Sequence, residues 1–119
     1  MEKLSSVLSW GDLGFENMDF AFSQAINLRT VPITSLGLAD VTSMRAMFAG
    51  AELFDADIGN WNTSNVRDMT LMFYQASTFN QDLSSWNVQF ICSEPNGFDD
   101  GATAWTAPRP DWEAECINP

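Results

Sequence analysis

Apolar residues recur along this sequence at fixed spacings in two segments. In the first segment they follow an i, i+3, i+6, i+7, i+10 pattern, at Val41, Met44, Met47, Phe48 and Ala51. The second segment repeats the pattern at an offset of 66 − 41 = 25 in residue number, at Val66, Met69, Met72, Phe73 and Ala76. This spacing places apolar side chains on one face of a short helix of about three turns. We therefore predict two equivalent amphipathic helices.

Polar residues stand where they can begin or end these helices. Asp40 and Asn65 directly precede the two apolar patterns, where a short side chain can cap free backbone N–H groups. Asp68 adds negative charge to the first turn of the second helix. Gly50 is expected to end the first helix.

A short segment with alternating apolar and polar residues follows each predicted helix. These segments are residues 57–62 and 82–87, and each ends in a Trp-Asn pair. The alternation predicts a short strand that leads into a turn. Because a helix and a strand cannot bury their apolar sides alone, consecutive repeats should stack and pair their strands in parallel. The predicted fold class is α/β, a short, capped, right-handed solenoid with parallel strands on one side and short helices on the other.

The whole chain, residues 1–119, is predicted to be one solenoid domain. It comprises an N-terminal cap with a divergent repeat at 1–40, full repeats at 41–65 and 66–90, and a degenerate repeat with a C-terminal cap at 91–119. Prolines, Trp105 and Trp112 in the last of these suit a stiff segment that covers the final repeat. Cys92 and Cys116 either form a bridge that pins this segment or remain reduced thiols.

The segment from Asn62 to Val88 resembles the repeat unit of BspA-like leucine-rich-repeat surface proteins. The motif V-x-x-M-x-x-M-F-x-x-A and the following W-N pair carry this resemblance, which spans roughly residues 10–90. It implies a leucine-rich-repeat-like solenoid that makes protein–protein contacts, often as an adhesin or lipoprotein on a bacterial surface. It implies no catalytic activity. The chain shows no signal peptide and no lipoprotein cysteine near its start, which favours a cytoplasmic location.

Charge and composition exclude several functions. Sixteen acidic residues against five basic ones give a net charge of −11, so the protein should repel nucleic acids and anionic membranes. The sequence contains no histidine, which removes the commonest general base and zinc ligand. Neither Asp55 with Asp57 nor Asp99 with Asp100 has the spacing of a calcium loop. We predict no catalytic residue, no metal and no cofactor.

The acidic residues provide the candidate binding site for a partner with a basic surface. The predicted contact residues are Asp55, Asp57, Asp82, Asp99 and Asp100. Our first hypothesis is a monomeric cytoplasmic protein that occupies a basic, nucleic-acid-binding groove as a nucleic-acid mimic or inhibitor. Small phage anti-restriction and anti-CRISPR proteins are analogous in size and charge only. The alternative is a BspA-like surface or adhesion protein that binds a host or neighbouring-cell protein, with acidic residues that mainly provide solubility.

Overall fold

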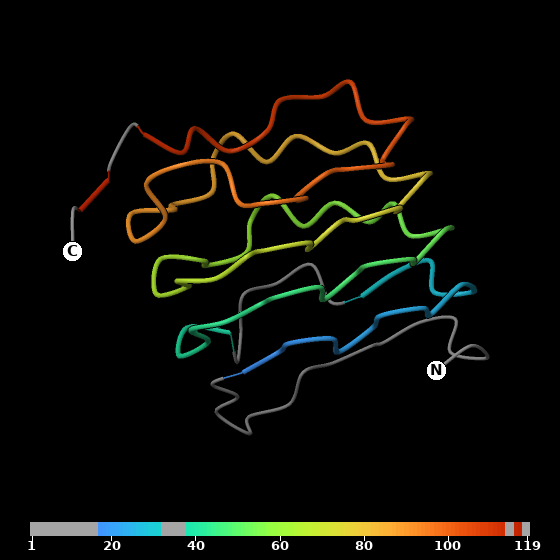
Figure 1. Ribbon diagram of the computed structural model, residues 1–119, viewed down its shortest axis with the longest axis horizontal. Helices are drawn as coiled ribbons and strands as arrows, with labels where there is room; N and C mark the ends of the chain where they lie inside the picture. Colours follow the sequence, from blue (N-terminus) through green and yellow to red (C-terminus); the bar gives the residue numbers. More distant parts are fainter. Residues whose placement is uncertain (1–16, 32–37, 114–115, 118–119) are drawn as a thin grey trace.

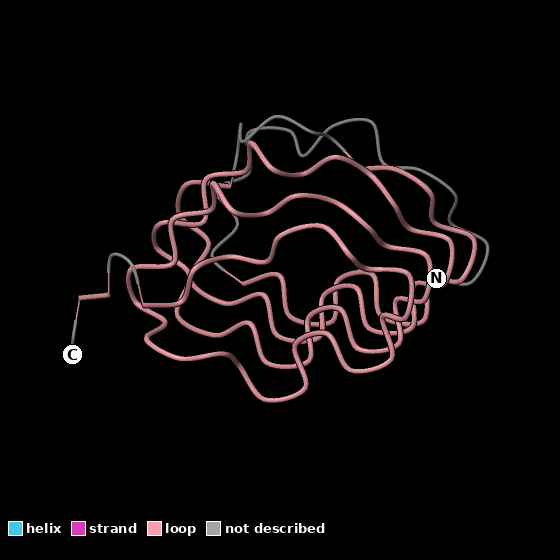
Figure 2. Cartoon of the chain, turned by 90° about the horizontal axis from the view of Figure 1, so that it is seen from above, coloured by secondary structure: helices cyan, strands magenta, loops and turns pink. Residues whose placement is uncertain are grey.

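The computed structural model describes residues 17–31, 38–113 and 116–117, and none of these residues belongs to an α-helix or a β-strand. Figure 2 shows the whole of this region of the chain as loops and turns. The predicted α/β solenoid, with helices on one side and parallel strands on the other, is therefore wrong. Residues 1–16 and 32–37 of the predicted N-terminal cap with a divergent repeat lie outside the described residues.

The described residues are folded in four layers, here termed windings, which lie one above the next in Figure 1. Winding 1 comprises 17–31 and 38–40, winding 2 comprises 41–65, winding 3 comprises 66–90, and winding 4 comprises 91–113 and 116–117. Residues with a left-handed backbone mark equivalent positions, because Phe20, Ala46, Leu71 and Gly97 all have φ between 52° and 66°. The successive offsets in residue number are therefore 46 − 20 = 26, 71 − 46 = 25 and 97 − 71 = 26.

Backbone hydrogen bonds join each winding to the next. The N–H groups of every second residue donate to carbonyl oxygens of the following winding, over distances of 2.7–3.1 Å. The donors are Met18, Phe20, Phe22 and Gln24 in winding 1, Met44, Ala46, Phe48 and Gly50 in winding 2, and Leu71, Phe73 and Gln75 in winding 3. In the sequence, each acceptor residue directly precedes the residue that has the donor's position in the following winding. Only isolated parallel bridges result in the described chain, from Ser43 to Asn17 and to Asp68.

Most of the N–H groups between these donors bond within their own winding, to carbonyl oxygens three residues earlier. In winding 2, Met47 donates to Met44 at 3.2 Å, and the third residue of that turn is Ala46, with φ of 52°. A positive φ at this place is what a type II turn requires. Gly50 is likewise the third residue of a later turn, in which Ala51 donates to the carbonyl oxygen of Phe48. A series of such turns brings every third or fourth residue inward, as a helix would, and this explains the wrong helix prediction.

Residues predicted to cap or end the helices have other roles. The Asn65 side chain donates through Nδ2 to the carbonyl oxygen of Ala39 in the preceding winding, at 2.7 Å. Asp68 accepts the backbone N–H of Thr70 at 2.9 Å. Gly50 has a φ of 74° within a turn and ends no helix.

Residues 57–62 and 82–87, which were predicted to be strands, contain turns. The backbone N–H of Trp61 donates to the carbonyl oxygen of Ile58 at 3.1 Å. The indole Nε1 of Trp86, one winding further, donates to the same oxygen at 2.9 Å. The turn in one winding is thus stabilised by a buried side chain from the next.

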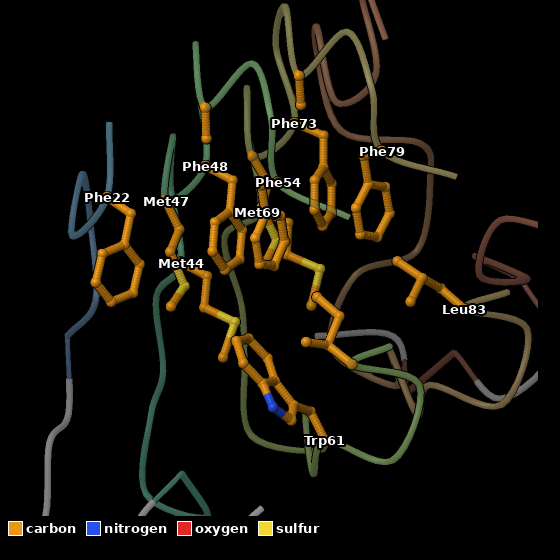
Figure 3. Close-up of a cluster of buried hydrophobic side chains, with 14 of the residues drawn as sticks. Phe22, Met44, Met47, Phe48, Phe54, Trp61, Met69, Phe73, Phe79 and Leu83 are labelled. Carbon is orange, nitrogen blue, oxygen red and sulfur yellow. The ribbon is translucent and has the colours of Figure 1, made fainter. Parts of the chain in front are cut away.

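The core consists of apolar side chains stacked from winding to winding (Figure 3). The ring of Phe48 stacks against those of Phe22 and Phe73, with centroids 5.7 Å and 5.6 Å apart. Phe54 and Phe79 stack beside them at 5.6 Å. The prediction of burial is confirmed for Met44, Phe48, Trp61, Met69, Phe73 and Trp86.

In winding 4 the rings turn edge-on to the stack. Phe98 meets Phe73 at an interplanar angle of 80°, and Trp105 meets Phe79 at 87°. Trp112, which is half-buried, contacts the ring of Phe98 with centroids 4.9 Å apart. The parallel stacks therefore end at this winding.

A disulfide between Cys92 and Cys116 closes winding 4. The sequence left open whether these cysteines are bridged or reduced, and the structure has them bridged. Beside the bridge, the backbone N–H of Ile117 donates to the carbonyl oxygen of Gln89 at 2.6 Å. The end of the described chain is thus attached to winding 3 as well as to the start of its own winding.

Candidate functional site

Asp57 and Asp82 are exposed and occupy equivalent positions in windings 2 and 3. The Oδ1 atom of Asp57 accepts the N–H of Gly59 at 3.1 Å. Asp82 Oδ1 accepts both the N–H and the hydroxyl of Ser84, at 2.9 Å and 2.6 Å. These local hydrogen bonds fix each carboxylate against its own turn through Oδ1. Because both side chains are exposed, each carboxylate can still accept hydrogen bonds from a ligand through its second oxygen.

Gly59 lies between the two aspartates. A Cβ atom added to Gly59 would stand 3.3 Å from Asp57 Oδ1 and 2.9 Å from the carbonyl oxygen of Asp82. Both aspartates therefore border the same glycine. Two like charges in adjacent windings repel each other, and the apolar core does not need them there.

Hydrogen bonding also favours the ionised form of Asp82. The hydroxyl of Ser84, and then its backbone N–H, lower the pKa of Asp82 below its ordinary value. Both donors favour the ionised carboxylate over the protonated one. Asp82 therefore stays negatively charged at neutral and mildly acidic pH.

Asp55 links two windings and differs in this from Asp57 and Asp82. Its Oδ1 accepts the N–H of Asn80 at 2.8 Å and the side-chain amide of Gln81 at 3.0 Å. Asn80 has the same role in the next winding, where its Oδ1 accepts the N–H groups of Thr106 and Ala107. A polar residue at this position thus bonds to the following winding. The Asp55 carboxylate is exposed, but one of its oxygens has a structural role.

Asp99 and Asp100 lie in winding 4, the winding that follows the one with Asp82. Asp99 Oδ2 is 2.9 Å from Nε of Arg109, and both side chains are partly buried. Asp100 is exposed, and its carbonyl oxygen accepts the N–H of Gln75 at 2.7 Å. Asp99 is therefore paired within the protein, whereas Asp100 is exposed as Asp57 and Asp82 are.

Another charged cluster joins the first three windings and was missed in the sequence. Asp19 Oδ1 accepts the hydroxyl of Ser43 at 2.5 Å and the backbone N–H of Arg45 at 2.8 Å. The Arg45 guanidinium is in turn 4.0 Å from Asp68. An offset of 45 − 19 = 26 in residue number places an acid and a base at equivalent positions. That offset was the signal that could have identified the cluster.

The described residues contain no group of three or more His, Cys, Asp or Glu side chains that could hold a metal ion. No helix in the described regions of the chain is long and apolar enough to cross a bilayer. Asp57 and Asp82 therefore remain the best-defined candidate site, as a pair of fixed and exposed carboxylates.

A protein-family model described as "Mycoplasma protein of unknown function, DUF285" matches residues 2–117. The match spans almost the whole chain, and the protein belongs to this family. The comparisons with curated proteins and with solved structures gave no match. Because the family description gives no activity, the function has to be inferred from the site.

Proposed function

We propose that this protein is a protein-binding module that contacts a basic region of its partner through Asp57 and Asp82. The observation that carries the proposal is the pairing of two exposed carboxylates at equivalent positions in adjacent windings, each held by its own turn. A lysine or arginine of the partner would form charge-assisted hydrogen bonds with these carboxylates.

The fixed geometry of the two carboxylates favours this role. The turns at Gly59 and Ser84 hold them before any partner arrives, which reduces the entropy lost on binding. The net charge of −11 would attract a basic partner over long range and speed its association. Asp57 and Asp82 would thus form the direct contact with the partner, and the net charge of the whole protein would provide the long-range attraction.

The proposed contact surface is smaller than the set of five acids that the sequence indicated. Asp55 and Asp99 each use a carboxylate oxygen to hold the protein together. They add to the negative field, but their carboxylates join separate parts of the fold, whereas those of Asp57 and Asp82 are held only by their own turns. Asp100 is exposed in winding 4, two windings away from Asp57.

Two settings suit a module of this kind. The charge of −11 favours a basic groove that otherwise holds nucleic acid, which the protein would occupy as a cytoplasmic mimic or inhibitor. The disulfide between Cys92 and Cys116 favours an oxidising compartment, where the module would bind a host or neighbouring-cell protein. We favour the second setting, because structural disulfides are rare in the reducing cytoplasm.

The site is tested with a fluorescein-labelled octalysine peptide as a basic probe, by fluorescence anisotropy at low and high salt. The test variant is Asp57→Asn/Asp82→Asn, and the control is Asp40→Asn/Glu52→Gln, which removes the same charge from other exposed positions. We expect the test variant to lose at least about threefold more affinity than the control at low salt. Equal losses would show that only net charge matters and would reject the site.

The setting is tested by the redox state of the cysteines in the cells that make the protein. Free thiols are alkylated at the moment of lysis, and the masses of the peptides that contain Cys92 and Cys116 are then measured. A bridge in the native protein supports the surface setting. Two alkylated thiols would favour the cytoplasmic mimic and leave the contact site unaffected.

A further inference from the structure

Asn62 begins a surface turn that its own side chain holds. Its Oδ1 atom accepts the backbone N–H of Ser64 at 3.1 Å and the Ser64 hydroxyl at 2.6 Å. The residue between them, Thr63, is buried, and its hydroxyl donates to the carbonyl oxygen of Asn87 in winding 3 at 2.9 Å. Asn62 itself is exposed. The inward anchor at Thr63 thus keeps the Asn62 side chain at the surface.

The side-chain nitrogen of Asn62 has no acceptor in the part of the chain that the structure describes. In this Asn62 differs from Asn65, whose Nδ2 donates to the carbonyl oxygen of Ala39 in winding 1 at 2.7 Å. Asn62 therefore stabilises the fold through its oxygen only. Because the residue is exposed, a group attached to Nδ2 would extend into solvent and break no hydrogen bond among the described residues.

The equivalent turn in winding 3 shows which of these features the fold needs. Asn87 Oδ1 accepts the N–H of Gln89 at 3.0 Å, which repeats the bond from Ser64 to Asn62. The turn therefore explains an asparagine in both windings. It does not explain the hydroxyl of Ser64, because Gln89 has none, and the Gln89 side-chain amide donates instead to the carbonyl oxygen of Ser64 at 3.0 Å.

Asn62, Thr63 and Ser64 make up an Asn-X-Ser sequence, the acceptor for N-linked glycosylation when X is not proline. No other asparagine among the 119 residues has Ser or Thr two positions later. The hydroxyl that the turn does not require is thus the one that the acceptor sequence does require. An N-linked glycan is bulky and needs a surface position, which Asn62 occupies.

We propose that Asn62 is an N-glycosylation site, which receives an oligosaccharide carried on a polyprenyl diphosphate lipid. In this transfer the Nδ2 atom of Asn62 forms a bond to the anomeric carbon of the first sugar. The bond between that carbon and the diphosphate oxygen breaks, and the lipid diphosphate leaves with its electron pair. Nδ2 loses one proton to the solvent. The step involves no net oxidation or reduction, and an oligosaccharyltransferase of the producing cell would catalyse it.

The disulfide between Cys92 and Cys116 supports the compartment that this modification requires. Disulfides persist in the oxidising lumen of the secretory pathway, and N-glycosylation sites belong to secreted proteins. The proposal therefore rests on the oxidising setting of the proposed function, but not on the contact through Asp57 and Asp82. Bridged cysteines with an unmodified Asn62 would reject the glycan alone, whereas a failed octalysine test would reject the contact alone.

The proposal is tested first on the protein from the cells that make it. Its peptides are treated with peptide N-glycosidase in water enriched in heavy oxygen, which converts a glycosylated asparagine into a labelled aspartate, and are measured by mass spectrometry. We expect the label at Asn62 and not at Asn87, whose sequence lacks the hydroxyl residue. An Asn62 peptide with no glycan before the treatment and no label after it would overturn the proposal.

Substitutions test the acceptor sequence itself. The full chain is translated behind a cleavable signal peptide in the presence of microsomes, and the glycan is detected as a loss of gel mobility that endoglycosidase H reverses. We expect the parent and Ser64→Thr, which keeps the hydroxyl, to gain one glycan. Asn62→Gln and Ser64→Gln should gain none, and the second of these copies the residue that winding 3 has at this position. A parent without a glycan, or a glycan on Asn62→Gln, would overturn the proposal.

The folded state provides the last test, because the structure must accept the glycan. The glycosylated parent is compared with Ser64→Gln, which keeps the asparagine of the turn but carries no glycan. Because Asn62 is exposed, both proteins should form the bridge between Cys92 and Cys116 to the same extent. A glycosylated parent that does not form the bridge, while Ser64→Gln does, would overturn the proposal.

Discussion

Gly101 packs directly against the backbone of Gln75. A Cβ atom at Gly101 would stand 3.2 Å from the Cα and 3.3 Å from the N atom of Gln75, and Gly101 has a φ of 81°. At the equivalent position in winding 2, the three atoms nearest to a Cβ at Gly50 all belong to the side-chain amide of Gln24, at 2.4–3.1 Å. Glutamine and glycine thus alternate at this position, and the glutamine of one winding covers the glycine of the next.

We predict that Gly101→Ala destabilises the protein more than Gly50→Ala does. Both changes force alanine into a left-handed conformation, which costs on the order of 1 kcal/mol. At Gly50 the neighbouring amide can swing aside, whereas at Gly101 the backbone of Gln75 cannot. Urea unfolding of the two variants gives the comparison, and a Gly50→Ala loss equal to or larger than that of Gly101→Ala would contradict it.

Phe73→Ala is predicted to cost about 3–5 kcal/mol of unfolding free energy, because it leaves a cavity at a fully buried position. The ring contacts Phe48 and Phe79 and is met edge-on by Phe98 from the last winding. Tyr74→Ala is the control, since Tyr74 is 37% exposed. Chemical denaturation should show a large loss for the first variant and a small one for the second. Similar midpoints for the two would show that the stack is not what stabilises the fold.

The apolar pattern predicted which side chains are buried but not the backbone that buries them. A helix and a series of turns that close every three residues bring almost the same positions inward. Met44 and Phe48 therefore fit either structure. What distinguishes them is the left-handed backbone at Ala46 and Leu71, residue types that rarely adopt it. The hydrogen bonds to the next winding hold these residues in place. Local propensity carries no information about such bonds.

The candidate site was predictable only in part, for a reason of register. The constant offset that relates Val41 to Val66 also relates Asp57 to Asp82, which puts them at equivalent positions of adjacent windings. The offset to the last winding is longer by one position, however, and that value aligns Asp99 with Phe73. The ion pair of Asp99 with Arg109 joins two residues of the same winding, which an offset between windings does not predict. The sequence alone made Asp99 look like a free surface acid.

Ser84→Ala is predicted to raise the pKa of Asp82 toward its ordinary value, because the hydroxyl of Ser84 is the main cause of the lowered pKa. In the parent protein, the lowered pKa contributes stability above the ordinary carboxyl pKa, and this contribution is lost as the pH falls through the lowered value. Nuclear magnetic resonance titration of the Asp82 carboxyl carbon measures the change. Ser85→Ala is the control, since the Ser85 hydroxyl donates to Gly59 instead. An unchanged pKa in Ser84→Ala would contradict the assignment.

Cys92→Ser/Cys116→Ser is predicted to lower the unfolding free energy by about 3–4 kcal/mol, the chain-entropy value for a loop of this length. The effect should begin in winding 4, where the bridge closes the chain, so amide exchange should accelerate first near Trp105 and reach Phe48 only with global unfolding. A reducing agent should lower the unfolding free energy of the parent protein by the same amount and should not change that of the double variant. The prediction fails if the parent, shown by thiol titration to be fully reduced, unfolds at the same denaturant concentration as its bridged form.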